Sequence, residues 1–403
     1  MQKWKNAQVF VELALSIDQY FPGYVDAYYG PQEILQSIER KGKIPLKELE
    51  EIASNLVNSI IQDSSLSAAR KEFLKGEVRA MQTTLRILQG EAPGFIEEVQ
   101  SLYGLTPSWT DEKIFEETHK NLDELLHGSG PLADRFQSFR EQLMISAETA
   151  APIINRLADD LQVRTRQRLI LPTDESCEYK FVNDKPWGAY NWYLGNYKSR
   201  IEINLDNPIR VYTLPHFITH EAYPGHHTEH SVKEQKYYRE LGYLEYCILL
   251  SNTPAAVISE GIGECALELI FSPEELVNIY QQILEEIGLS NYTGRLIYEF
   301  VHIASHPLRK VGDNKLLLLH DKGASDDEVI AYGRRYGLSS EKEAKRSIQF
   351  AKDPLWRSYG FNYSLGYELV SKLLLSTENK DHMFTRLLQE SLTPAQVQRM
   401  VSQ

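Results

Sequence analysis

Residues 214–230 read Leu-Pro-His-Phe-Ile-Thr-His-Glu-Ala-Tyr-Pro-Gly-His-His-Thr-Glu-His. Five of the eleven histidines in the chain lie in this stretch: His216, His220, His226, His227 and His230. Neutral imidazole is the commonest metal ligand in proteins, and its pKa lies near neutrality. A cluster this dense, with Glu221 directly after His220, therefore predicts a metal site.

The order of residues is similar to the H-E-x-x-H motif of zinc peptidases. In that motif two histidines one helical turn apart hold zinc, and the glutamate acts on the bound water. Here His226 follows His220 by six positions, and on an unbroken helix it would point about 120° away. Pro224 and Gly225 lie between them, and proline removes an internal hydrogen bond of a helix. We therefore expect a helix that breaks at Pro224-Gly225 and returns His226 to the side of His220.

Two other histidine pairs fit a regular helix better, because their members are four residues apart and share one face. These pairs are His216 with His220 and His226 with His230. In the pair His216 and His220, the glutamate (Glu221) follows the second histidine and not the first, as the motif requires. In the pair His226 and His230, no glutamate directly follows His226. The plainer interpretation is an amphipathic helix with hydrogen-bonded histidines. The sequence leaves open which of His216, His226, His227 and His230 completes the site.

A second candidate segment is the predicted helix over 255–268, in which Glu260, Glu264 and Glu268 are spaced four residues apart. Like charges at this spacing repel each other by roughly a few tenths of a kcal/mol per pair. No Lys or Arg lies in the helix, so a metal or a histidinium from elsewhere would relieve the repulsion. The alternative is a solvated acidic face. Gly261 and Gly263 favour the close approach of another helix, since glycine is otherwise costly inside a helix.

Most of the chain shows apolar residues at helical spacing, bounded by Pro, Gly, Ser or Asp. We expect β-structure only over about residues 170–206, where 190–204 has the pattern of a hairpin. The predicted fold is mainly α. It forms a single domain over 1–403, with a helical half (1–165), a half that carries the motifs (166–403) and a small sheet beside the active-site cleft. The edge of that sheet either binds an extended peptide by strand addition or only closes the helical layer.

Composition and charge argue against some classes of partner and against a membrane-spanning protein. The 403 residues are 42% hydrophobic and 25% charged, which is ordinary for a globular protein. The formal net charge of −13 argues against nucleic acid or an anionic membrane as the main partner. No run of 18 apolar residues occurs, so no membrane span is expected.

Cysteine usage and the N-terminal sequence indicate the compartment. Cys177, Cys247 and Cys265 form no close pair, so no disulfide framework is expected and a reducing compartment is favoured. The first residues lack the apolar region and cleavage site of a signal peptide. We expect a cytoplasmic protein.

Three stretches together resemble a large bacterial family of uncharacterised proteins. They are His-Glu-Ala-Tyr-Pro-Gly-His-His (220–227), Ile-Ser-Glu-Gly-Ile-Gly-Glu (258–264) and Asn-Tyr-Ser-Leu-Gly-Tyr-Glu-Leu (362–369). Residues 185–187, 190–195 and 353–356 add to the resemblance, which covers roughly 180–395. That family is related to the helical gluzincin metallopeptidases, such as carboxypeptidase Taq, thimet oligopeptidase and angiotensin-converting enzyme.

The resemblance implies a zinc-dependent hydrolase. By that analogy His220, His226 and Glu260 hold the zinc ion, and Glu221 is the general base. Glu264 orients a histidine ligand, and we expect His227 to support the ligands beside it. Tyr363 matches a tyrosine that steadies the oxyanion, and His306 is an alternative donor for that role.

The predicted reaction is metal-assisted hydrolysis of a peptide or a small amide, with Arg309 or Arg357 as the candidate group that holds a terminal carboxylate. A di-iron oxidase would need two Glu-x-x-His pairs on separate helices, and only Glu299-Phe-Val-His302 is present. A third possibility is a helical binding protein on a degenerate peptidase scaffold. A closed site with four protein ligands would favour that scaffold, whereas an open site beside a base would favour the hydrolase.

Overall fold

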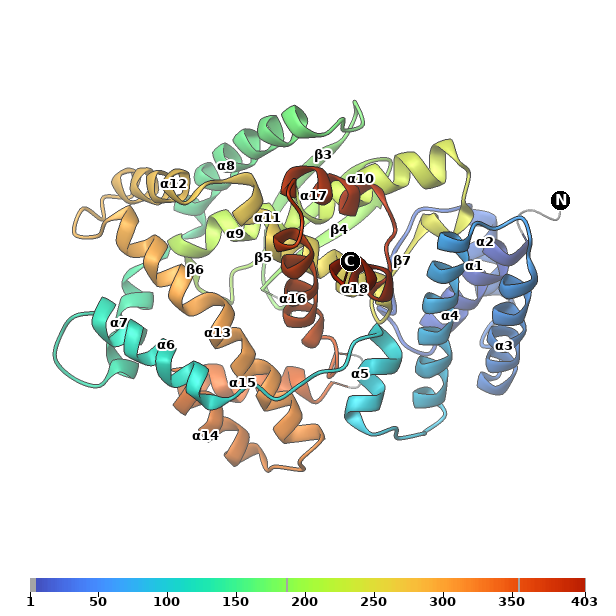
Figure 1. The fold of residues 1–403 in the computed structure, drawn as a ribbon, viewed down its shortest axis with the longest axis horizontal. Helices are drawn as coiled ribbons and strands as arrows, with labels where there is room; N and C mark the ends of the chain where they lie inside the picture. The colour runs from blue at the N-terminus through green and yellow to red at the C-terminus, as the bar shows by residue number, and fades with distance from the viewer. Residues whose placement is uncertain (1–4, 186–187, 354–355, 403) are drawn as a thin grey trace.

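The computed structural model describes residues 5–185, 188–353 and 356–402. Helices dominate it and the sheets have only two or three strands, which confirms the predicted mainly α fold (Figure 1). Pro186, Trp187, Pro354 and Leu355 of the quoted stretches lie outside the described residues. Within the described part of the chain, no helix combines the length and apolar character that crossing a bilayer requires.

The first helices form one end of the molecule, with their own apolar core (Figure 1). They are α1 (Lys5–Asp18), α2 (Gln32–Lys41), α3 (Leu46–Gln62) and α4 (Ala68–Leu88). In α1 the buried Phe10, Val11, Leu13, Ala14 and Ile17 recur at helical spacing and face α3 and α4. Ile248 and Leu250, from far along the chain, complete this core.

A second and larger apolar core joins the remaining helices. These are α5 (Phe95–Tyr103), α6 (Glu112–Leu125), α7 (Leu132–Gln142), α8 (Ala147–Arg168), α9 (Leu214–Glu221), α10 (His226–Lys233), α11 (Pro254–Ile270), α12 (Pro273–Glu286), α13 (Gly294–His320), α14 (Asp326–Tyr336), α15 (Glu341–Ala351), α16 (Phe361–Leu375), α17 (Lys380–Gln389) and α18 (Pro394–Val401). A capping box of Ser325 with Glu328 begins α14. The two cores meet between α4 and α5 and do not follow the predicted halves 1–165 and 166–403.

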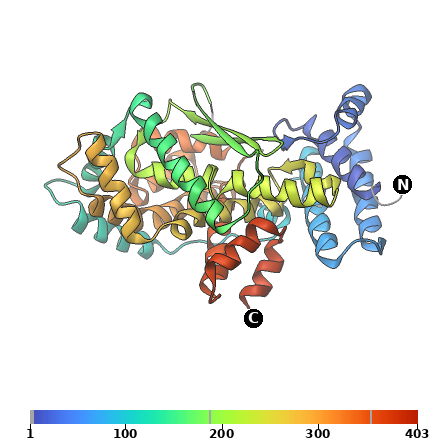
Figure 2. The same ribbon diagram turned by 90° about the horizontal axis from the view of Figure 1, so that it is seen from above.

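The predicted hairpin is present. Strands β4 (Ala189–Gly195) and β5 (Lys198–Asn204) pair antiparallel, and β3 (Ser176–Val182) pairs parallel with β5 on the other side. Asn196 and Tyr197 make the turn with φ of 52° and 60°, as a two-residue hairpin loop requires. This sheet and helices α17 and α18 lie on opposite sides of the molecule (Figure 2).

The expectation that β-structure occurs only over 170–206 was wrong. Strand β1 (Val25–Tyr28) pairs with β7 (Ile248–Leu250), and β2 (Met144–Ile145) pairs with β6 (Ile209–Arg210). These strands have two to four residues and find partners far away in sequence. Such short strands show no local alternation, so periodicity cannot reveal them. The pairing of β1 with β7 ties the N-terminal helices to the motif half.

Two glycines let α11 and α16 pack closely. A Cβ atom at Gly261 would lie 2.5 Å from the carbonyl oxygen of Gly366, and one at Gly366 would lie 2.4 Å from that of Val257. The close helix approach predicted at Gly261 is therefore confirmed. It holds the candidate residues of α11 and α16 against each other.

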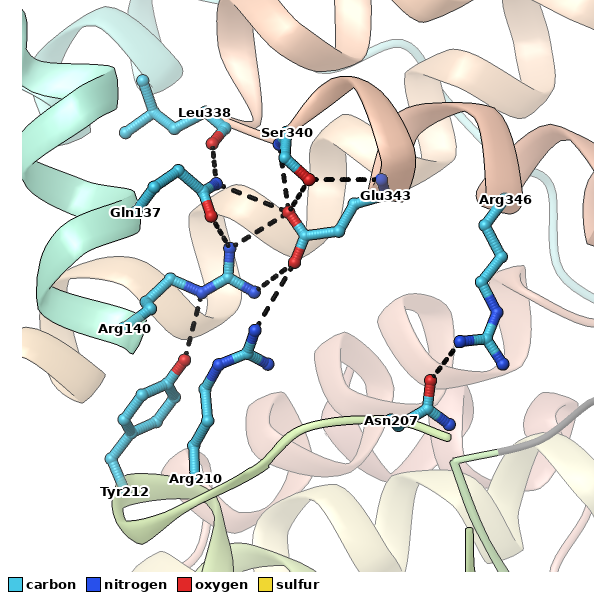
Figure 3. A network of polar contacts seen from close by, with 9 residues as sticks. All are labelled: Gln137, Arg140, Asn207, Arg210, Tyr212, Leu338, Ser340, Glu343 and Arg346. Carbon is cyan, nitrogen blue, oxygen red and sulfur yellow. Dashed lines mark hydrogen bonds and ion pairs between the residues drawn. The ribbon is translucent and has the colours of Figure 1, made fainter. Parts of the chain in front are cut away.

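A polar network fixes the chain just before α9 (Figure 3). Glu343 in α15 accepts a hydrogen bond of 2.8 Å from Arg140 in α7, and Arg210 in β6 lies 3.6 Å from the same carboxylate. Arg140 also donates to the hydroxyl of Tyr212 at 3.1 Å, in the short helix η2 (Val211–Thr213). The backbone amide of Ser340 caps the carboxylate at 3.0 Å. Helices α7 and α15 are thereby tied to the segment that leads into α9.

Candidate metal centre

The helix that carries the first histidines breaks where the sequence predicted. Helix α9 ends at Glu221 and α10 begins at His226, with a cis bond before Pro224. A Cβ atom at Gly225 would lie 1.9 Å from the carbonyl oxygen of His220, so only glycine fits this crossing. The break brings the rings of His220 and His226 to a centroid distance of 4.6 Å.

Helix α11 adds a carboxylate to this pair. Oε2 of Glu260 lies 3.2 Å from Nε2 of His220 and 3.8 Å from Nε2 of His226. Ligand atoms bound to zinc at about 2.0–2.2 Å in a tetrahedron lie roughly 3.3–3.6 Å apart. Glu260 is buried, and no hydrogen-bond partner among the described residues reaches its Oε2 atom. A buried acceptor without a donor needs a compensating group, so the donor set and the spacing fit a zinc ion.

Each of these three residues has a partner behind it. Nδ1 of His220 faces Oε1 of Glu264 at 3.5 Å, and Nδ1 of His226 lies 3.1 Å from the hydroxyl of Ser259. Tyr359 donates a hydrogen bond of 2.7 Å to Oε1 of Glu260. Such outer partners fix the orientation of metal ligands.

Gly263 makes room for the first histidine. A Cβ atom at this position would lie 2.7 Å from Nδ1 of His220. Both glycines that the sequence singled out in this helix therefore serve close approaches, Gly261 to α16 and Gly263 to the imidazole. The tight fit leaves Nε2 of His220 directed at Glu260.

The competing group of His216, His220 and Glu264 also converges. Nε2 of His216 lies 3.7 Å from Oε1 of Glu264, but the guanidinium of Arg309 already pairs with that oxygen. A fixed cation at the carboxylate disfavours a second one beside it. The group with His226 and Glu260 is therefore the better metal site.

The other competing pair, His226 with His230, forms a ring stack with centroids 5.9 Å apart. Burial lowers the pKa of His230 to about 3. His230 therefore stays neutral and lines the cleft beside the three convergent residues.

The charges of the centre are strongly coupled. Burial raises the pKa of Glu260, but the nearby nitrogens of His220 and His226 outweigh it and lower that pKa to about 2. Burial lowers the pKa of His226, but its contact with Glu260 prevails and raises that pKa to about 9. Without a metal, a proton on His226 therefore supplies the positive charge at this point.

Glu221 faces the same cleft of about 240 Å³ as His220, His226 and Glu260. Burial raises the pKa of its carboxyl, and the nearby His220 and His226 oppose that shift in part. Its backbone carbonyl accepts a hydrogen bond of 2.6 Å from Asn191 in β4. The end of α9 is thereby fixed against the three-stranded sheet.

Two tyrosines from the start of α16 and the turn before it border the centre. Tyr363 lines the cleft with its ring 6.2 Å from that of His220. Burial raises the pKa of Tyr363 well above its usual value, so its hydroxyl keeps its proton. The sequence patterns did not single out Tyr359, although its position four residues before Tyr363 was an available signal.

The structure places two predicted residues away from the centre. Both ring nitrogens of His227 are occupied, by Glu175 at 2.9 Å and by Ser199 at 2.9 Å. His306 stacks on Tyr367 with ring centroids 3.7 Å apart and does not line the cleft. Consecutive residues at the start of a helix point in different directions, so His227 turns to the sheet while His226 faces Glu260.

The acidic face predicted on α11 is divided. Glu260 and Glu264 are buried, whereas Glu268 is exposed and lies 3.6 Å from Nε2 of His306. Histidines and Arg309 therefore relieve the repulsion that the spacing predicted. The solvated acidic face remains only at Glu268.

Strands β1 and β4 also contribute to the lining of the cleft. Asp26 in β1 accepts a hydrogen bond from the hydroxyl of Tyr190 in β4. Burial raises the pKa of Asp26 to about 7, although His226 opposes the shift. No local pattern marks this contact, because 164 residues separate its partners.

The pair proposed for a di-iron centre does not assemble with other ligands. Glu299 is exposed, and His302 stacks on Tyr298 with ring centroids 5.9 Å apart. Among residues 5–185, 188–353 and 356–402, neither belongs to a convergent group of metal-ligating atoms. The geometry gives no support to the oxidase hypothesis.

No protein-family model and no curated protein matches the sequence. The chain is similar to the crystal structure of a candidate lipoprotein from Colwellia psychrerythraea, with 16% identity and a TM-score of 0.56 over 89% of this chain and 69% of the other. It is also similar to a candidate lipoprotein of unknown function from Shewanella oneidensis, with 12% identity and a TM-score of 0.49 over 92% and 76% of the two chains. The first similarity shows only that the two chains share a fold. The second similarity is too weak to show even that.

Proposed function

We propose that this protein is a zinc-dependent peptidase that hydrolyses amide bonds in peptides. The observation that carries the proposal is the convergence of Nε2 of His220, Nε2 of His226 and Oε2 of Glu260, directly beside the cleft-facing Glu221. Three protein ligands and an adjoining cleft are typical of catalytic zinc sites, whereas structural sites are closed by four. The resemblance to helical gluzincins agrees with this assignment.

Zinc bound here would lower the pKa of a water molecule to about 7 and polarise the scissile carbonyl. Glu221 accepts a proton from the attacking water and delivers it to the nitrogen of the leaving amine. A C–O bond forms and the C–N bond breaks, so the products are a carboxylate and an amine. The raised pKa of Glu221 suits a group that both takes and returns a proton.

Tyr363 donates a hydrogen bond to the oxyanion in this proposal. Its position on the cleft wall and its raised pKa support the role, because a donor must keep its proton throughout the reaction. His306 is not retained, since it stacks on Tyr367 outside the cleft lining.

Strand β4 supplies a surface for an extended substrate. It pairs with β5 along one edge, and Ala189, Tyr190 and Asn191 line the cleft. A peptide beside this strand would pass the metal centre with its backbone extended, as in strand addition.

The test is hydrolysis of a mixed peptide library by the zinc-loaded protein, with products identified by mass spectrometry. Glu221→Gln is expected to lower the rate roughly 10²- to 10⁴-fold while zinc stays bound. Glu268→Gln is the matched control, because this carboxylate lies on α11 but outside the cleft lining, and it is expected to keep wild-type activity. Equal rates for Glu221→Gln and wild type would refute the role of the base. Absence of hydrolysis in the zinc-loaded wild type would favour a non-catalytic binding protein.

A further inference from the structure

The cleft extends from the metal centre to the N-terminal helices. Phe10 in α1, and Phe73 and Glu77 in α4, line it together with Tyr246, which comes from far along the chain. Phe73 and Glu77 are four residues apart and therefore share one face of α4. The rings of Phe73 and Tyr246 stack with their centroids 5.3 Å apart. We call Phe10, Phe73, Glu77 and Tyr246 the distal subsite of the cleft.

Glu77 places a carboxyl group without a cationic partner in the distal subsite. Its side chain is only 3% exposed. The backbone amide of Ala255 donates to it at 3.1 Å, and the side chain of Thr253 lies close by, but both of these groups are uncharged. Burial therefore prevails and raises the pKa of Glu77 to about 7. A buried carboxylate that faces no cation is costly, so a positively charged ligand would stabilise it.

The neighbouring charges along the cleft are already paired within the protein. Glu245 pairs with Arg70, and Glu229 pairs with Lys233. Of the described residues that line the cleft, Lys233 is the only lysine or arginine. Away from the metal centre, the cleft therefore offers a ligand the carboxylate of Glu77 and no free lysine or arginine.

The two arginines that the sequence suggested for binding a terminal carboxylate have other roles. Arg309 pairs with Glu264, and Arg357 pairs with Glu98. Neither arginine lines the cleft, whereas Asp26 adds a further carboxyl group to its wall. The charge that this wall presents to a substrate is negative, which favours a ligand with a cationic group.

The aromatic rings of the distal subsite suit the same kind of ligand. The face of an aromatic ring attracts a cation that lies within about 6 Å of the ring centroid. Side chains four residues apart on a helix have Cβ atoms roughly 5–6 Å apart, so a cation bound to Glu77 can also contact the ring of Phe73. Leu249, Leu250 and Ala256 line the cleft as well. Apolar walls of this kind hold the hydrocarbon stem of an amine.

The fold sets how far the distal subsite lies from the metal ligands. Ala255, whose amide contacts Glu77, precedes Glu260 by five residues in α11, a rise of about 7.5 Å along the helix. One residue of an extended peptide spans about 3.3–3.6 Å. An amine at Glu77 would thus lie about two residues from a bond held at the zinc ligands.

We propose that the distal subsite binds a protonated amino group of the substrate and that Glu77 is the counter-ion of this group. The inference rests on the proposed peptidase function and deepens it, because it names a substrate class. The substrates are short peptides that carry an amine about two residues from the bond that is cleaved. The amino terminus of a peptide and the side chain of a lysine both supply this chemistry.

The test is calorimetric binding of three tripeptide amides to the zinc-loaded Glu221→Gln protein, in which turnover is expected to be slow. Acetyl-norleucine-Ala-Ala is neutral, acetyl-Lys-Ala-Ala carries a side-chain amine, and norleucine-Ala-Ala has a free amino terminus. A charge-assisted hydrogen bond predicts that at least one amine ligand binds roughly ten- to hundredfold more tightly than the neutral ligand. Adding Glu77→Gln is expected to abolish this preference. Glu72→Gln is the matched control that should keep it, because it removes the same charge from α4 outside the cleft lining.

Equal binding of the three ligands would overturn the proposal before Glu77 is changed. A preference that survives Glu77→Gln, or that Glu72→Gln also abolishes, would overturn it as well. The tighter of the two amine ligands identifies the source of the amine. Hydrolysis by the wild type is measured in parallel. A preference for an amine that depends on Glu77, without hydrolysis of any peptide, would leave the amine site standing and refute the peptidase.

Discussion

His226 and His227 are neighbours that begin the same helix, yet their surroundings differ in kind. Both nitrogens of His227 are occupied, by Glu175 and Ser199, and Tyr223 donates to the same glutamate at 2.5 Å. Nε2 of His226 instead faces Oε2 of Glu260 at 3.8 Å, an oxygen that no donor among the described residues reaches. The first cluster is fully hydrogen-bonded within the protein, whereas the second brings three metal-ligating side chains together.

The difference separates residues that hold the fold from residues that are suited to bind a ligand. Buried polar groups in proteins almost always have partners, so an unsatisfied convergence of ligand atoms marks a site. The following predictions test whether side chains with complete hydrogen bonding support stability, and whether side chains with unpaired polar atoms support ligand binding.

The largest effect on stability is expected for His227→Ala. This change removes a fully buried ring and the donor to Glu175, and it is expected to lower the free energy of unfolding by roughly 2–4 kcal/mol. Zinc content should stay at the wild-type level in the folded protein. Chemical denaturation and elemental analysis measure the two quantities. Loss of zinc with unchanged stability would reverse the assignment of the two histidines.

Tyr359→Phe should act on the metal rather than on the fold. It removes the hydrogen bond to Oε1 of Glu260, and the loss of such an outer partner typically weakens metal binding about 10- to 100-fold. A competition titration with a zinc chelator measures the affinity. Tyr332→Phe is the control, because this hydroxyl donates to Glu112 in another part of the molecule. Equal affinities in wild type and Tyr359→Phe would show that the tyrosine does not position the ligand.

Lys315→Met is expected to make the protein more stable. Burial lowers the pKa of Lys315 to about 8, so the folded state accommodates the ammonium group less favourably than the unfolded state does. Removing the charge should raise the free energy of unfolding by roughly 1–3 kcal/mol at this pH. For the wild type, stability should rise as the pH increases from 8 toward 10.5, where the folded state binds fewer protons than the unfolded state. A destabilised Lys315→Met would show that the ammonium supports the fold.

The smallest expected effect is the release of a proton from His226 when zinc binds. In the metal-free protein the pKa of His226 is raised to about 9, so its protonation contributes stability that is complete below pH 6.5 and lost as the pH rises through 9. Zinc must displace this proton, so binding at pH 7.5 should release about one proton and strengthen as the pH rises. Calorimetry in buffers of different ionisation enthalpy measures the release. His216→Ala is the control, and zinc binding to this variant should release the same number of protons as binding to wild type. If zinc binding to wild type released no proton, the contact of a protonated His226 with Glu260 would be contradicted.

Local patterns were sufficient for much of the fold. Apolar periodicity predicted the helices, and the alternation in 190–204 predicted the hairpin of β4 and β5. Pro224 and Gly225 predicted the break between α9 and α10, because both act on the backbone where they stand. Gly261 predicted the packing of α11 on α16.

Contacts between segments that are far apart in the chain could not be predicted from local sequence patterns. The pairing of β1 with β7 depends on the closure of a loop of more than two hundred residues, and nothing local records it. Likewise, His227 differs from His226 only through Glu175 and Ser199. Lys315 looked like any surface lysine until α14 and α15 covered it.

The most direct test is the zinc content of wild type, His226→Ala and His227→Ala, purified without chelator and measured by elemental analysis. We expect about one zinc ion per chain in wild type and in His227→Ala, and none in His226→Ala. Zinc retained by His226→Ala, or absent from wild type, would contradict the metal centre of His220, His226 and Glu260.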